Sequence, residues 1–237
     1  MKKNIKRGLI LSSCVLMCLS AVGCGSGKDK KSDKKNVETS ENIMDVRTAK
    51  IINQQQAILK FTTDNKAGSV VSIELVPSGD NYTYTLDAVN KKGVEFIYTI
   101  DAKSGNISKK EEKGPIDKAN APEYIDFVPV LDIDKAGKAA VQLAENPDAN
   151  QILAYKLFSD GGKNIYQITL TDGGEGEAAK NEKILIDAVT GKKLTEEDIK
   201  KAEENKKEED AKKAAEKQKA AQEKANTANE SGKSDIE

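Results

Sequence analysis

The chain has 237 residues, which is enough for one or two domains. Charged residues make up 32% and aromatic residues 4% of it, so we expect a modest core and some segments that lie outside it. The absence of histidine excludes Ser-His-Asp triads, Cys-His pairs and zinc sites built on imidazole. We therefore expect a non-enzyme with no catalytic, metal-binding or cofactor-binding residues, although chemistry carried by carboxylates alone stays open.

The N-terminus has the residue order of a secretory signal. A basic stretch, residues 1–8, precedes an apolar run, residues 9–21, which is shorter than the span of about 20 residues that a membrane helix needs. The run closes on Leu19-Ser20-Ala21-Val22-Gly23-Cys24, which resembles the lipobox of bacterial lipoproteins. The resemblance implies that residues 1–23 are a signal peptide and that Cys24 carries the lipid, including palmitate. The alternative is a plain signal peptide with incidental cysteines.

A lipid on Cys24 would hold the mature chain at the outer face of the bacterial cytoplasmic membrane. Residues 24–42 are rich in Gly, Ser, Lys and Asp, so we expect a flexible tether there. Removal of the signal lowers the 38 basic residues to 34 against 39 acidic ones, a net charge of about −5. Such a chain has no basic excess for phosphates, so we expect no nucleic-acid partner.

Residues 43–113 change from a helical to a strand period. Apolar positions in 51–61 have helical spacing, which predicts an amphipathic helix over residues 43–62. Alternating apolar residues in 71–75, 82–86 and 94–100 then predict three strands, joined by turn-like segments at 77–81 and 90–93. Short connections favour antiparallel neighbours, and the helix is expected to cover the apolar face.

Residues 131–194 repeat this order after a predicted linker, residues 114–130. A helix with Asp134 as its expected N-cap is followed by alternating stretches in 153–157, 166–170 and 184–186. The predicted fold class is α+β, with two tandem modules, each a helix plus a three-stranded antiparallel sheet. Because about 60 residues are marginal alone, we expect the modules to pack together or to share a sheet.

The two modules also share a motif, which indicates an internal repeat. Tyr82 precedes Ile100 by 18 positions, and Tyr166 precedes Ile186 by 20, so we infer a two-residue insertion in the second copy. Each isoleucine begins the pattern Ile-Asp-Ala-x-Ser/Thr-Gly. We interpret it as a structural turn, in which Asp and Ser/Thr side chains bond the backbone and Gly supplies a positive φ. The turn residues are Asp101, Ser104, Gly105, Asp187, Thr190 and Gly191.

This pattern resembles the PepSY domain, over roughly residues 46–108 and 131–194. The family occurs in propeptides of secreted metallopeptidases and in bacterial envelope proteins. The resemblance implies a lipid-anchored, extracytoplasmic protein that binds a secreted or envelope peptidase and inhibits or localises it. The alternative function is a non-catalytic structural or accessory component of a cell-envelope complex.

Residues 195–237 are rich in Lys, Glu and Ala with almost no large apolar residue after Ile199. Acid-first pairs at spacing i, i+4 support a solvated helix at the start of this segment. The remainder has the composition of a disordered tail.

Overall fold

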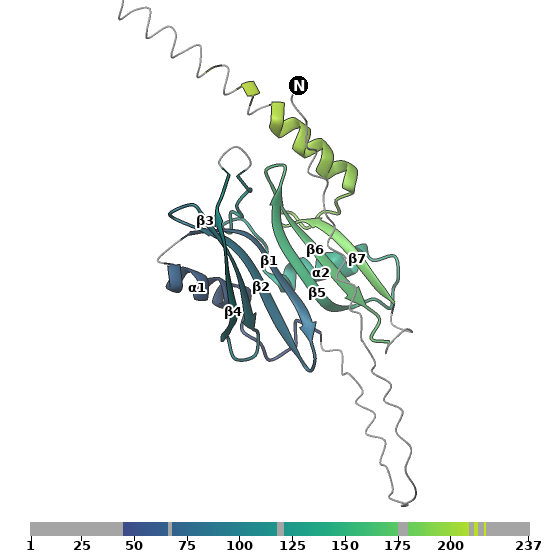
Figure 1. Cartoon of the computed structure of the whole chain (residues 1–237). Helices are drawn as coiled ribbons and strands as arrows, with labels where there is room; N and C mark the ends of the chain where they lie inside the picture. The colour runs from purple at the N-terminus through teal and green to yellow at the C-terminus, as the bar shows by residue number, and fades with distance from the viewer. Residues whose placement is uncertain are drawn as a thin grey trace, which may run out of the picture. The chain divides into compact units, whose positions relative to one another are not determined.

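The structure is a computed structural model that describes residues 45–65, 68–117, 121–174, 180–208, 211–212 and 216. These residues fall within one compact unit, Thr39–Glu237. In the described part, seven strands form one antiparallel sheet in the order β4-β3-β2-β1-β5-β6-β7 (Figure 1). The mixed helix and antiparallel-sheet class is confirmed. The two predicted three-stranded modules do not form sheets of their own: they share one sheet, as one of the two expected arrangements had it, and β4 adds a fourth strand to the first half.

Each half of the sheet begins with a helix. The first half comprises α1 (Gln54–Asn65), β1 (Gly68–Ser78), β2 (Asn81–Asn90), β3 (Val94–Asp101) and β4 (Ile107–Pro115). The second comprises α2 (Ile133–Leu143), β5 (Gln151–Asp160), β6 (Lys163–Thr171) and β7 (Asn181–Asp187). A further helix occupies residues 196–208. None of the described helices is long and apolar enough to cross a membrane.

One face of the sheet carries the core. Alternate strand residues lie side by side on it; Ile73, for example, is opposite both Leu86 and Leu157. Phe61 of α1 and Ala140 of α2 are fully buried in the same cluster, so both helices cover this face. The core is therefore continuous across the two halves.

The halves are joined by strand pairing and by two reciprocal crossings. β1 pairs with β5 over Ser72–Leu75. The segment before α1 reaches the second half, where the Val46 amide donates to the Ile152 carbonyl at 2.9 Å. The segment before α2 reaches the first half, where the Ile125 amide donates to the Val70 carbonyl at 2.9 Å. Each half thus contributes a segment to the other, which predicts that they fold as one unit.

The strand registers correct the predicted alignment of the repeat. Tyr84 is opposite Ile100, and Tyr166 is opposite Ile186, so Tyr84 rather than Tyr82 is the counterpart of Tyr166. The spacings are then 16 and 20, and the extra four residues fall in the β6–β7 connection. A slip of two residues keeps every side chain on the same face, which explains why the alternation did not reveal it.

Both predicted helix starts also need correction. α1 begins at Gln54 rather than near residue 43, because Asn53 and Gln56 cap it reciprocally with two backbone bonds of 2.9 Å. The N-cap of α2 is Asp132, not Asp134, and its Oδ1 accepts from the Lys135 amide at 2.9 Å. The predicted linker is partly structured, because β4 extends to Pro115 and Ile125 is buried.

Candidate functional site

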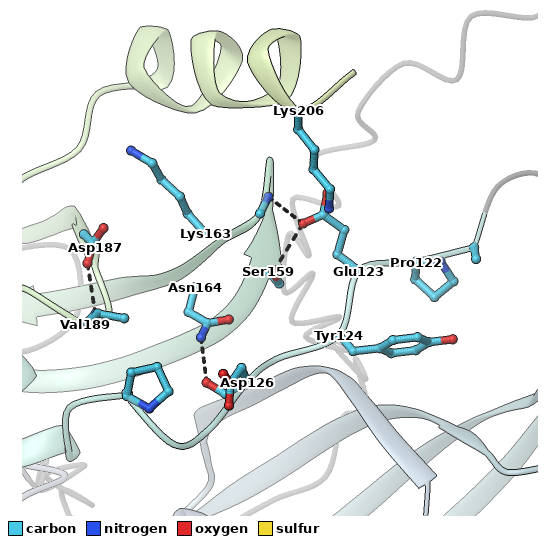
Figure 2. A pocket seen from close by; sticks show the side chains of 13 residues that line it. Pro122, Glu123, Tyr124, Asp126, Ser159, Lys163, Asn164, Asp187, Val189 and Lys206 are labelled. Carbon is cyan, nitrogen blue, oxygen red and sulfur yellow. Dashed lines mark hydrogen bonds and ion pairs between the residues drawn. The ribbon is translucent and has the colours of Figure 1, made fainter. Parts of the chain in front are cut away.

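A cleft of about 560 Å³ lies beside the second half of the sheet (Figure 2). Its walls come from the crossing segment 121–130, which we call the strap, from the β5–β6 hairpin and from the turn after β7. The helix 196–208 contributes Lys206. Elements distant in the sequence therefore meet here, as is usual for binding sites on a rigid scaffold.

Glu123 fixes the start of the strap to the hairpin. Its Oε2 accepts from the Gly162 amide at 2.8 Å and from Ser159 Oγ at 3.3 Å, and its Oε1 lies 2.6 Å from Lys206 Nζ (Figure 2). Burial alone would raise the pKa of Glu123, but the bonds from Lys206 and Gly162 outweigh it and lower the pKa. Glu123 therefore stays charged at neutral pH and connects three elements.

Three more hydrogen bonds hold residues that line the cleft. Asn164 Nδ2 donates to the Asp126 carbonyl at 2.7 Å, which holds the middle of the strap against β6. Asp126 Oδ1 accepts from the Val128 amide at 3.1 Å, at a bend in the strap. The Asp187 carboxylate accepts from the Val189 amide at 3.0 Å at the opposite wall. These carboxylates are occupied by backbone donors, so the cleft is held in shape by its own polar groups.

Three exposed apolar side chains, which we call the rim, lie at or beside the cleft: Tyr124 and Val189 line it, and Val128 lies on the strap next to the lining residue Pro129. Tyr124, Val128 and Val189 are 39%, 93% and 40% exposed, and they are three of the five exposed large hydrophobic residues in the described part of the chain. The other two, Leu59 and Ile107, lie on α1 and β4. Large exposed apolar side chains that lie near one another are a feature of protein docking surfaces. The rim is thus the best candidate contact surface in this region.

The residues predicted to form turns lie in two equivalent turns after β3 and β7. Asp101 Oδ1 accepts from the amide and Oγ of Ser104, both at 2.7 Å, and these bonds lower the pKa of Asp101. Gly105 follows with φ of +70°. Only a residue without a Cβ adopts this backbone conformation without strain.

The second turn repeats this geometry. Asp187 Oδ1 accepts from the Thr190 amide at 2.8 Å, and Gly191 has φ of +71°. The alanine of each turn is fully buried, and its carbonyl accepts from the chain just before a helix: Ala102 from the Ile52 amide at 2.7 Å, and Ala188 from the Leu131 amide at 2.8 Å. The turns therefore fix where the two helices begin.

The two aspartates of these turns do not form a carboxylate pair. β3 and β7 are five strand spacings apart in the sheet, which corresponds to about 24 Å at roughly 4.8 Å per spacing. Paired catalytic carboxylates need about 5 to 9.5 Å. Only Asp187 lines the cleft, and within the described residues no cluster of acidic or cysteine side chains could hold a metal ion.

The strap is the part of the candidate site that sequence reasoning missed. The strap lies within the predicted linker, residues 114–130. Pro122 and the absence of a strand or helix period in the sequence of this segment favour a linker there. Its apolar content was the available signal: Tyr124, Ile125, Phe127 and Val128 are too many for a solvated spacer. Cys24 and the predicted tether, residues 24–42, lie outside the described residues, as does most of the predicted tail.

Comparison with known proteins places the first half in context. Residues 45–111 match the family model described as "PepSY: Peptidase propeptide and YPEB domain", which covers α1 to most of β4. No curated protein matches the chain significantly. The crystal structure of a protein described as a "putative lipoprotein" from Clostridium difficile 630 has a similar fold, with a TM-score of 0.53 and 16% identity over 64% of this chain and 96% of that one. The chain thus contains a PepSY-like region at residues 45–111 within a fold that it shares with that protein.

Proposed function

We propose that this protein is a non-catalytic lipoprotein, anchored outside the cytoplasmic membrane through Cys24, that binds a secreted or envelope peptidase and inhibits or localises it. Both halves of the sheet act as PepSY-like modules, and the apolar rim of the cleft is the docking surface. The observation that carries the proposal is the PepSY match over residues 45–111 behind a lipobox-like N-terminus.

The rim supports docking by a protein rather than by a small molecule. Val128 is 93% exposed, so water contacts an aliphatic side chain that a partner could bury. Tyr124 combines an apolar ring with a polar hydroxyl, and tyrosine is enriched where proteins meet. The strap presents both side chains from a backbone fixed by Glu123 and Asn164, so little conformational entropy remains to be lost on binding.

Crosslinking on intact cells, followed by purification of the full chain, tests the rim. The double variant Tyr124→Ser, Val128→Asp should lose the crosslinked partner, because it removes apolar contact area and adds a charge. Leu59→Asp is the matched control: Leu59 is 61% exposed but lies on α1, away from the cleft. Equal capture by the rim variant and the wild type would exclude the rim as the docking surface.

Enzymology then separates the two functions considered. If the partner is a peptidase, its activity should fall when the purified chain is added, or its membrane-bound fraction should fall when Cys24 is replaced by serine. Capture of envelope proteins without any peptidase would instead support an accessory role in an envelope complex. Labelled palmitate should enter the wild type and not Cys24→Ser; equal labelling of both would remove the anchor from the proposal.

A further inference from the structure

The outer edge of β7 lacks a strand that the first half of the sheet has. After the turn that follows β3, Ile107 pairs back with Ile100, and the chain continues along β3 as β4. After the equivalent turn that follows β7, Lys193 pairs back with Ile186. β7 is nevertheless the last strand of the sheet, and no described strand lies on its outer side (Figure 1). The second half therefore has an open position where the first half has β4.

A helix cap turns the chain away from this edge. The Leu194 amide still donates to the Leu185 carbonyl at 2.8 Å. Directly afterwards, the Thr195 amide donates to Asp198 Oδ2 at 2.8 Å, and the Asp198 amide donates to Thr195 Oγ1 at 3.1 Å. This reciprocal cap begins the helix 196–208 at the point where the first half continues as a strand.

The open edge presents a row of backbone groups. The Asp187 amide donates to the Lys192 carbonyl at 2.9 Å, and the Leu185 carbonyl accepts from Leu194, so both residues direct backbone groups away from β6. Alternate residues of an antiparallel strand face the same side, which adds Lys183. In the described part of the chain, no strand pairs with the Leu185 amide or with the amide and carbonyl of Lys183. Such a row is a template for a further strand.

The charge along this edge favours an acidic occupant. Lys183 is exposed and forms no ion pair with a described residue, and the exposed Lys180 precedes the strand. The counterpart of Lys183 in the first half is Ile97, which lies opposite Glu111 of β4. Lysines on an edge strand keep copies of one chain apart, because like charges repel across strands. The edge thus suits an acidic segment of another protein better than a second copy.

The core side of the open position is apolar. In the first half, Lys110 of β4 lies opposite Tyr98 and contacts Asp64 of α1 at 2.6 Å. The counterpart of Tyr98 is Ile184, which is 2% exposed. Equal spacing from the two helix caps makes Leu143 the counterpart of Asp64, and Leu143 packs against the core. Two aliphatic side chains replace a polar pair, so an apolar residue fits the place of Lys110.

We propose that the outer edge of β7 binds an extended segment of another protein, with alternating acidic and apolar residues, as an additional antiparallel strand. An acidic residue lies opposite Lys183, and an apolar residue lies opposite Ile184 beside Leu143. The added strand takes the place that β4 has in the first half and bonds the outward backbone groups of Lys183 and Leu185. The proposal depends neither on the rim nor on the partner being a peptidase.

Hydrogen exchange of the full chain in non-ionic detergent tests the added strand, with a blocked heptapeptide of alternating valine and glutamate as the probe. The peptide should slow exchange of the Lys183 and Leu185 amides at least about tenfold, whereas the Ile184 amide, which faces β6, should not change. The same peptide N-methylated at its glutamates should give no protection, because it lacks the donors that face β7. No protection by the unmethylated peptide at about 1 mM would overturn the proposal. Protection of both amides in the free chain would also overturn it, since a second copy or another segment of this chain would then occupy the edge.

Lys183→Glu gives the decisive variant. Lys183 is exposed, so its replacement should leave the fold intact. Binding of the valine–glutamate peptide, measured by fluorescence anisotropy, should weaken about tenfold, because an attractive cross-strand pair becomes a repulsive one. A valine–lysine peptide should bind the variant more tightly than the wild type. Lys91→Glu, at an exposed lysine in the turn between β2 and β3, is the matched control and should keep the wild-type preference. Equal affinities of the wild type and Lys183→Glu for each peptide would refute the pairing.

Discussion

Truncation of Phe61 tests whether the two halves of the sheet unfold together. Phe61 lies on α1 in the first half, is fully buried and packs edge-on against Tyr98, with ring centroids 5.6 Å apart. Its replacement by alanine should cost about 3 to 5 kcal/mol, from lost burial and the cavity left behind. If the halves form one unit, amides of β6 in the second half should lose the same free energy of protection as amides of β2. That loss corresponds to an exchange rate higher by about two to three and a half orders of magnitude.

The expectation follows from contacts that cross between the halves. The Val46 and Ile125 amides each bond a carbonyl of the other half, and Tyr155 Oη lies 3.4 Å from Tyr84 Oη in the shared core. Hydrogen exchange measured residue by residue gives the result. Leu59→Ala on the same helix is the control, and it should change protection by no more than about 0.5 kcal/mol because Leu59 is largely exposed. Full protection of β6 beside a weakened β2 would refute the single unit.

Three further predictions concern individual side chains. We expect Tyr84→Phe and Tyr166→Phe each to lower the free energy of unfolding by about 1 to 2 kcal/mol in urea titrations, because each hydroxyl donates to a backbone carbonyl just before a helix. Markedly unequal losses would show that the two tyrosines are not equivalent. Burial and the charge of Glu95 raise the pKa of Asp87 to about 6, so its contribution is most favourable below the ordinary pKa and declines as the pH rises through about 6. Because Asp87 is partly exposed, Asp87→Asn should gain about 1 kcal/mol at pH 8 and nothing at pH 4, and a gain at both would refute the linkage. Gly68→Ala should lower the free energy of unfolding, measured by thermal unfolding, by about 1 to 3 kcal/mol, because the new Cβ would lie 2.4 Å from the carbonyl oxygen of Val89. An unchanged Tm would contradict that close approach.

The sequence analysis predicted the strands in which buried and exposed residues alternate. It missed β4, in which they do not. β2 alternates regularly between Tyr82, Tyr84 and Leu86 on the core face and threonines on the other. β4 carries Lys109 to Lys113 and is mostly exposed, so its sequence has no apolar period. It forms because an edge strand needs only one paired side, and Lys110 fixes it by contacting Asp64 at 2.6 Å and lying 5.0 Å from the centre of the Phe96 ring.

The two Asp-Ala-x-Ser/Thr-Gly turns could be predicted from the sequence, whereas the cleft could not. Asp, Ser/Thr and Gly at fixed spacing act within a few residues of each other, so their bonds follow from local chemistry. The cleft depends on Glu123 meeting Gly162 and Lys206, which are 39 and 83 positions away. No local period encodes such a meeting, because it depends on the path of the strap across the assembled sheet.

Comparison of the two halves of the sheet shows which structural features they share and where they differ. After each Asp-Ala-x-Ser/Thr-Gly turn the chain first pairs back in the same way, Ile107 with Ile100 and Lys193 with Ile186. The first half then continues as β4, whereas the second leaves the sheet and forms the helix that rests on its own hairpin.

The two segments that cross between the halves, before α1 and before α2, also differ from each other. The Val46 and Ile125 bonds are equivalent, and equal spacing makes Ala49 the counterpart of Val128. Ala49 packs against the core, while Val128 is 93% exposed. Val128 stays exposed to water, although its counterpart Ala49 is packed against the core. Because it buries almost no apolar surface, Val128 contributes little to folding. Substitutions in the shared turns should therefore lower stability, whereas substitution of the 93% exposed Val128 should leave stability unchanged and act on binding.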